Sequence, residues 1–79
     1  MAAILSASPG PGGGRRGLHQ LRELLEMMRV SVIPEELAIG AASAAFDAEG
    51  RLVRAEDVAG LREVATALAH ATERNKEAA

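Results

Sequence analysis

The segment that most restricts the fold is Ser8 to Gly14, which holds two prolines and four glycines in seven residues. Such a run continues neither a helix nor a strand, because proline lacks an amide donor and glycine is conformationally loose. Before it, Ala2 to Ser6 is a short apolar run typical of a parallel strand covered on both faces. After it, apolar residues recur at helical spacing and predict a helix. These residues are Leu18, Leu21, Leu24, Leu25 and Met28.

A second strand is predicted at Val30 to Ile33, where β-branched residues precede Pro34. Strand, loop, helix and strand form one βαβ unit, whose crossover is expected to be right-handed. Residues 35–46 hold a weak helical pattern, and residues 47–50 read as a turn. A further helix is expected from about Glu56, where apolar residues again line one face.

The expected fold class is α/β, with two parallel strands and flanking helices (βαβα) that form a fragment of a three-layer sandwich. Residues 1–79 make a single partial domain, with a frayed tail at 74–79. The chain has no cysteine and one aromatic residue, so its core is small and has no covalent reinforcement. A two-stranded parallel sheet leaves both edges open, which suggests that strands are missing or that a partner is needed.

The net charge of −2, with both signs interspersed, disfavours nucleic acid and anionic membranes as partners. The sequence has no apolar run of roughly 20 residues and no signal-peptide pattern, so a cytoplasmic location is expected. His19 and His70 fall on different predicted helices without cysteine, which predicts no metal site and no catalytic base. Ser6 and Ser8 lack the context of a nucleophile elbow and read as hydrogen-bonding loop residues.

Four blocks of the sequence are similar to motifs of one enzyme family. The first two are Ser6-Ala7-Ser8-Pro9-Gly10 and Gly13-Gly14-x-Arg16 with Leu21-Arg22; the others are Val32-Ile33-Pro34-Glu35 and Ala45-Phe46-Asp47 with Gly50-Arg51-Leu52. Their order and spacing resemble the S-x-S-P-G-x-x-G-G-x-R…L-R, V-L-P-E and A-F-D-x-x-G-R-L segments of NADPH-dependent FMN reductases. The chain thus resembles the C-terminal half of a flavodoxin-like domain of that family.

The resemblance implies NAD(P)H-dependent reduction of bound FMN, with electrons passed to a quinone, a metal ion or another small acceptor. The flavin contacts that it implies are Ser6, Ala7, Ser8, Pro9, Gly10, Gly13 and Gly14. Glycines let the backbone approach a flat ring, and loop amides can bond to its polar edge at the carboxyl ends of parallel strands. No residue is expected to be catalytic, because the flavin carries the chemistry.

The resemblance also places Met1 just before the fourth strand of the family fold. The first three strands and the loop that cradles the FMN phosphate would then lie outside this chain. Three accounts follow: a truncated reductase, a half-protein that pairs with a separate N-terminal half, and a non-catalytic oligomerisation module that has lost the cofactor. In each, the isolated chain is expected to be inactive as a reductase.

Two other interpretations of the glycine-rich run remain open. It can be a flexible linker that binds nothing. Gly12 to Gly17 also fits G-x-G-x-x-G, with Glu35 near the distance of a ribose-binding acid, which would indicate a Rossmann-type dinucleotide-binding fragment. In that fingerprint, however, the first glycine follows the strand almost at once, whereas five or more residues intervene here.

Arg16 and Glu35 form a separate hypothesis. Arg16 opens the first predicted helix and Glu35 follows the second predicted strand, so both are expected at the ligand-binding rim. There they could pair with each other or with a neighbouring subunit, since members of the family resembled are commonly dimers or tetramers. The alternative is two independent solvated charges.

Overall fold

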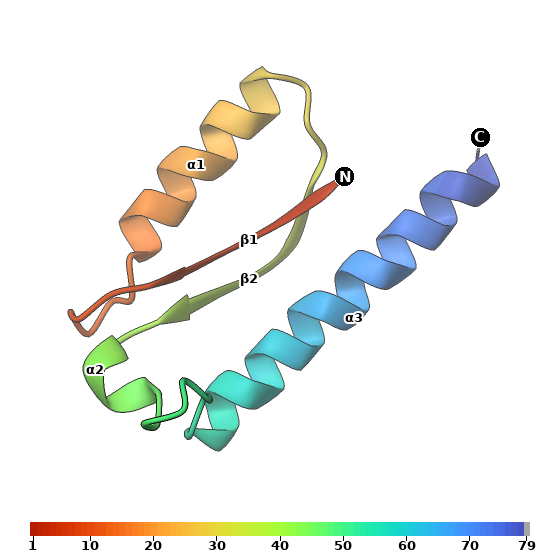
Figure 1. Ribbon diagram of the computed structural model, residues 1–79. Coiled ribbons are helices and arrows are strands. Elements are labelled where there is room, and N and C mark those ends of the chain that lie inside the picture. The colour runs from red at the N-terminus through yellow and green to blue at the C-terminus, as the bar shows by residue number, and fades with distance from the viewer. Residues whose placement is uncertain (79) are drawn as a thin grey trace.

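The computed structural model describes the backbone of residues 1–78 and the side chains of residues 1–74. Its elements are β1 (Ala2–Ala7), α1 (Arg15–Met27), β2 (Val32–Ile39), α2 (Ala42–Ala45) and α3 (Ala55–Ala78). The strands pair in parallel as a two-stranded sheet, with α1 on one side and α3 on the other (Figure 1). The predicted βαβα order is confirmed. A frayed tail was predicted for residues 74–79. Of these residues, only Arg74 has a described side chain.

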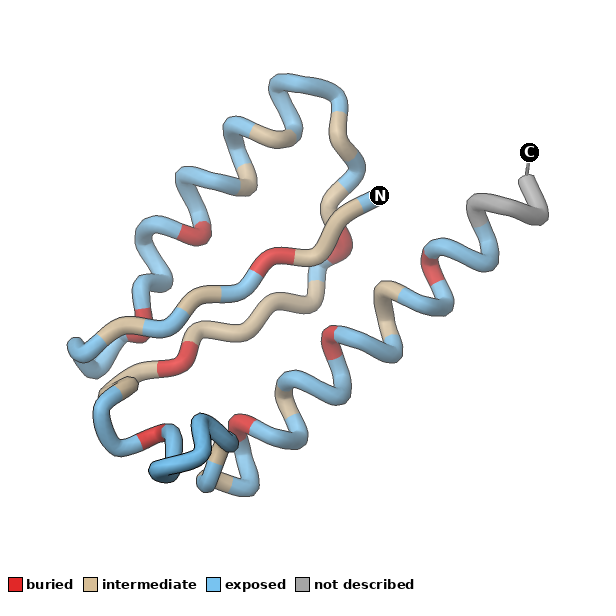
Figure 2. Tube along the Cα trace, viewed as in Figure 1, coloured by how far each residue is buried: buried red, intermediate tan, exposed pale blue. Residues whose placement is uncertain are grey.

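The two faces of the sheet pack differently against the helices. Ile33 and Leu37 pack with Val64 and Ala71 of α3, whereas Glu36 points to α1. Figure 2 shows that buried positions are few and isolated along each element. In the described residues, the buried apolar positions are Ile4, Leu18, Ile33, Ile39, Ala45, Val64 and Ala71. The core is therefore thin, as expected for so short a chain.

The bounds of β2 differ from the prediction. The predicted strand ended at Pro34, but β2 runs from Val32 through this proline to Ile39. Ala2 pairs with Val32 while Ile4 pairs with Glu36, so β2 carries two extra residues at this point. This bulge accommodates a residue that lacks an amide donor.

The start of β2 is set by the end of α1. The amide of Val30 donates to the carbonyl of Leu25 and that of Arg29 to Glu26, both at 2.9 Å, and Arg29 has a φ of 64°. This is a Schellman cap, which uses the amide that a strand at Val30 would need. The weak helical pattern predicted for residues 35–46 is wrong for 35–39, which continue the strand, and only Ala42–Ala45 are helical.

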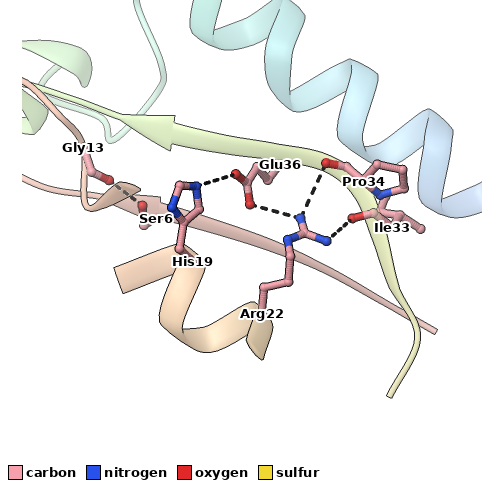
Figure 3. Close-up of polar contacts among 7 residues, drawn as sticks. All are labelled: Ser6, Gly13, His19, Arg22, Ile33, Pro34 and Glu36. Atoms are coloured by element: carbon pink, nitrogen blue, oxygen red, sulfur yellow. Dashed lines mark hydrogen bonds and ion pairs between the residues drawn. The ribbon is translucent and has the colours of Figure 1, made fainter. Parts of the chain in front are cut away.

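Arg22 of α1 compensates for the bulge in β2. Its Nη1 donates to the Ile33 carbonyl at 2.9 Å, and its Nη2 donates to Glu36 Oε2 at 3.0 Å (Figure 3). Nη2 also lies 3.5 Å from the Pro34 carbonyl. Both carbonyls belong to the segment of β2 where the register with β1 shifts, and the guanidinium fork donates to them. This side chain therefore holds α1 over β2.

The predicted turn at residues 47–50 is confirmed. Asp47 Oδ1 accepts from the amides of Glu49 and Arg51, each at 2.9 Å, and the Gly50 amide donates to the Asp47 carbonyl at 3.0 Å. Phe46 and Leu52 form an antiparallel bridge around the turn. The turn thus reverses the chain between α2 and α3.

Replacement of Arg22 by Met keeps the aliphatic length but removes the donors to Ile33 and Glu36. We expect the free energy of unfolding to fall by about 1–2 kcal/mol, because a half-buried carbonyl loses a charged partner. Arg15→Met is the matched control, since the Arg15 side chain makes no hydrogen bond to the described residues, and it should change stability by less than about 0.5 kcal/mol. Urea denaturation followed by circular dichroism measures both, and equal midpoints would contradict the role of Arg22.

Candidate functional site

The glycine-rich loop lies at the carboxyl ends of both strands. It follows β1 directly, and the Ser8 amide donates to the carbonyl of Ile39, the last residue of β2, at 3.0 Å. The Ala42 amide donates to Ser8 and the Ala41 amide to Gly10, both at 2.9 Å. The loop and the start of α2 are thus joined over the end of the sheet, where ligands bind in open α/β folds.

Gly13 fixes the loop against β2. It is buried and has a φ of 65°, and a Cβ built on it would lie 2.7 Å from the carbonyl carbon of Ile39 and 2.8 Å from that of Ala38. A side chain at Gly13 would therefore force the loop and strand apart. The Ser6 hydroxyl donates to the Gly13 carbonyl, and the Gly13 amide donates to Gly10 at 3.3 Å. These contacts make the loop a packed structure, which argues against a flexible linker.

The outer side of the loop presents amides that are free to bind a ligand. Within the part of the chain that the structure describes, the amides of Gly12, Gly14, Arg16 and Gly17 have no protein acceptor. All four residues are exposed. Gly14 is the N-cap of α1 and offers no side-chain cap, so the first-turn amides and the positive end of the helix dipole face solvent. The arrangement suits a ligand edge rich in hydrogen-bond acceptors.

The predicted contact residues differ in what they offer. Ser8 Oγ accepts from the Gly10 amide at 3.3 Å, and Ser6 donates inward, so both hydroxyls serve the loop itself. Gly13 is buried and shapes the loop, whereas Gly14 offers its amide. The other predicted contacts, Ala7, Pro9 and Gly10, are exposed at the end of β1 and in the loop. The structure therefore brings the seven residues together, and their contact with a flavin stays a prediction.

Glu35 does not lie at the rim where the sequence placed it. It belongs to the early half of β2, within the bulged segment, and lines a groove against α3 with Ala59 and Arg62. Arg16 is at the start of α1, on the opposite face of the sheet. The misplacement follows from ending the strand at Pro34. No ion pair joins the two within the described residues, and a subunit contact by either stays a prediction.

Arg54 is a rim residue that sequence reasoning missed. Its Nη2 donates to the Gly40 carbonyl just beyond β2, and its Nε donates to Asp57 Oδ2 at 2.6 Å. Asp57 is buried at the start of α3. The pair thus ties the first turn of α3 to the carboxyl end of the sheet. The only sequence signal was the acidic pair Glu56 and Asp57 in the first turn of α3. Acidic residues are common there because they interact favourably with the helix dipole.

The two histidines come from different helices, His19 from α1 and His70 from α3. His19 Nε2 lies 3.8 Å from Glu36 Oε1, with its side chain 63% exposed, beside the Arg22 bond to the same carboxylate (Figure 3). His70 lines the groove between β2 and α3. They therefore lie on opposite faces of the sheet and share no site.

Comparison with protein-family models, with curated proteins and with solved structures finds no match. In the portion of the chain that the structure describes, no helix combines the length and apolar character needed to cross a membrane. The flavin hypothesis accordingly depends on the four sequence blocks and on the geometry of the loop.

Gly13→Ala should lower the free energy of unfolding by roughly 2–3 kcal/mol. The added Cβ would clash with the β2 backbone, and alanine is also strained at the positive φ of this position. Gly12→Ala is the matched control one residue away, with nothing within 4 Å of its Cβ. It should be neutral or stabilising by up to about 1 kcal/mol. Chemical denaturation of both variants compares them directly. Similar losses would show that the loop does not pack on β2 as described.

Proposed function

We propose that this chain forms one wall of the flavin site of a flavodoxin-like, NAD(P)H-dependent FMN reductase. The observation that carries the proposal is the set of four acceptor-free amides, those of Gly12, Gly14, Arg16 and Gly17, at the carboxyl ends of parallel strands. The first two of the four sequence blocks that resemble those reductases span this loop and the helix that follows it. A Rossmann-type site is less well supported, because Gly12 is separated from β1 by the four residues Ser8–Pro11.

The residues present fit the edge of an isoalloxazine. That edge carries carbonyl oxygens and ring nitrogens, which accept hydrogen bonds, and the Gly12 and Gly14 amides are donors without a side chain to hold the ring away. The uncapped start of α1 favours partial negative charge on the edge that it faces. The loop stays in place without ligand because Gly13 and Ser6 anchor it, so binding needs little ordering of the backbone.

FMN, when bound, supplies the redox chemistry between NADPH or NADH and a small acceptor such as a quinone or a metal ion. The chain's own residues orient the ring and hydrogen-bond its polar edge. No side chain in the loop is required to move a proton. This agrees with the Ser6 hydroxyl donating to the Gly13 carbonyl rather than facing the ligand side.

Binding by the isolated chain should be weak. The free edge of β1 and the exposed Leu5 beside it leave one side of the site without protein. The remaining ring contacts and the phosphate contacts would come from residues outside this chain. A dissociation constant on the order of 0.1–1 mM is expected, equivalent to about −4 to −5.5 kcal/mol.

Titration of the ¹⁵N-labelled chain with FMN, followed by heteronuclear NMR, tests the proposal residue by residue. We expect saturable shifts at the amides of residues 12–17 and small shifts elsewhere. Inorganic phosphate and AMP serve as controls for simple anion binding and for adenine nucleotide binding. Shifts caused equally by AMP would favour the dinucleotide-binding alternative, and unshifted loop amides at saturating FMN would refute a flavin site.

Gly17→Glu separates ligand binding from folding. A glutamate at the third helical position can bond to the free Gly14 amide as in a capping box, so it should stabilise α1 while occupying a proposed flavin donor. We expect FMN affinity to fall about tenfold, or roughly 1.4 kcal/mol. Gly17→Ala also improves helix propensity but adds no carboxylate, and its affinity should match the parent chain. Equal FMN affinity in both variants would exclude Gly14 as a donor.

A further inference from the structure

The peptide between Gly40 and Ala41 connects the start of α3 to the glycine-rich loop. Its carbonyl oxygen accepts a hydrogen bond from Arg54 Nη2, and its N–H donates to the Gly10 carbonyl at 2.9 Å. Arg54 directly precedes α3, whereas Gly10 lies in the loop between β1 and α1. Because a peptide bond is planar and does not rotate freely, these two bonds hold one rigid unit from both sides.

The backbone at this peptide has a conformation that alanine does not favour. Ala41 has a φ of 46°, in the left-handed region that is unfavourable for a residue with a Cβ. The loop also lies very close to Gly40, since a Cβ built on this glycine would overlap the Pro11 carbonyl oxygen and lie 2.9 Å from the Pro11 carbonyl carbon. A strained conformation of this kind persists only where the surrounding contacts impose it.

Asp57 fixes the side chain of Arg54. Arg54 Nε donates to Asp57 Oδ2 at 2.6 Å, and Asp57 is 7% exposed. The Asp57 amide donates in turn to the Arg54 carbonyl at 3.1 Å, within the first turn of α3. Because the guanidinium group is a rigid plane, the bond at Nε also sets the direction of Nη2. The start of α3 therefore directs a charged donor at the Gly40 carbonyl.

The Gly10 carbonyl connects the peptide to the donor amides of the loop. It accepts from the Gly13 amide at 3.3 Å as well as from the Ala41 amide, so it belongs both to this contact and to the turn at residues 10–13. Gly12 lies inside that turn, and Gly14 follows it as the N-cap of α1. A shift of the Gly10 carbonyl would therefore move the two amides that are proposed to bind the flavin.

Few other contacts hold the outer half of the loop, residues 10–12. Pro11 has no amide, and the Gly12 carbonyl accepts from the Arg15 amide at 3.2 Å. All three residues from Gly10 to Gly12 are exposed. The direction of the Gly12 amide therefore depends largely on the Gly10 carbonyl and on the peptide that bonds to it.

We propose that Arg54 is a positioning residue of the flavin site. It acts through the Gly40–Ala41 peptide, which holds the Gly10 carbonyl and with it the turn that presents the Gly12 and Gly14 amides. The role rests on the proposed flavin site, and it extends that site to the start of α3, on the opposite face of the sheet from α1. Arg54 itself makes no contact with the ligand.

A role in stability alone would have different consequences. If Arg54 only ties α3 to the sheet, its loss lowers stability, and the chains that remain folded bind FMN as the parent chain does. If Arg54 positions the loop, its loss also weakens FMN binding by folded chains. The apparent dissociation constant scales inversely with the fraction of the protein in its binding-competent conformation. The two roles therefore separate in measurements on folded protein.

Amide exchange in the ligand-free, ¹⁵N-labelled chain tests the contact without FMN. In Arg54→Met, exchange of the Ala41 and Gly13 amides should accelerate about tenfold, because a charge-assisted bond no longer holds the peptide. Arg62→Met is the matched control, since it removes an exposed arginine of α3 that has no ion pair with the described residues. Unchanged exchange at Ala41 and Gly13 in Arg54→Met would overturn the positioning role, whatever the result with FMN.

Titration of the same variants with FMN tests the link to the flavin site. The dissociation constant of Arg54→Met should rise about fivefold, and that of Arg62→Met should match the parent chain. Unchanged affinity in Arg54→Met despite faster loop exchange would overturn the inference and leave Arg54 as a tether of α3. A parent chain that binds no FMN would remove the flavin site and this role with it, whereas the exchange rates would still show whether Arg54 holds the loop.

A double variant covers the case in which Arg54→Met fails to fold. Loss of Arg54 alone leaves the Asp57 carboxylate buried without its partner, which is destabilising. Arg54→Met with Asp57→Asn removes both charges, and it should keep helical circular dichroism while binding FMN about fivefold more weakly. Asp57→Asn alone keeps the donor to Gly40 and should bind FMN as the parent chain does. Equal FMN affinity in the double and single variants would contradict the inference.

Discussion

The close approach of Gly13 to the backbone of β2 is the contact on which the arrangement of the chain depends. It brings the loop after β1 across the end of β2, so that Ser8 and Gly10 can bond to Ile39 and the start of α2. The direction in which α1 leaves the loop follows from the same contact. A chain with so few buried side chains gains much of its order from such backbone packing.

The bulge at Pro34 and the guanidinium of Arg22 act together at the other end of the sheet. Arg22 donates to the Ile33 carbonyl in the bulged segment and to Glu36 just after it, and so holds α1 over β2. Pro34 itself has no amide that could donate to an added strand.

The elements with strong local patterns were predictable from sequence, and those fixed by distant contacts were not. The apolar run of β1, the helical spacing in α1 and α3 and the turn after Asp47 each carry their own signal. The limits of β2 depend on the cap at Val30 and on pairing with β1, neither of which has a local signature. The error on Glu35 followed from that boundary. The stripe on α1 was found as one face, but within it only Leu18 is buried, Leu25 is half-buried, and Leu21, Leu24 and Met28 are exposed.

The proposed flavin site makes a demand on the edge of β1 that the described residues do not meet. A flavin site enclosed on both sides needs a strand beside β1 whose carboxyl end lies next to the glycine-rich loop, and only a parallel neighbour places it there. The weak FMN binding expected of the isolated chain follows from the lack of this neighbour.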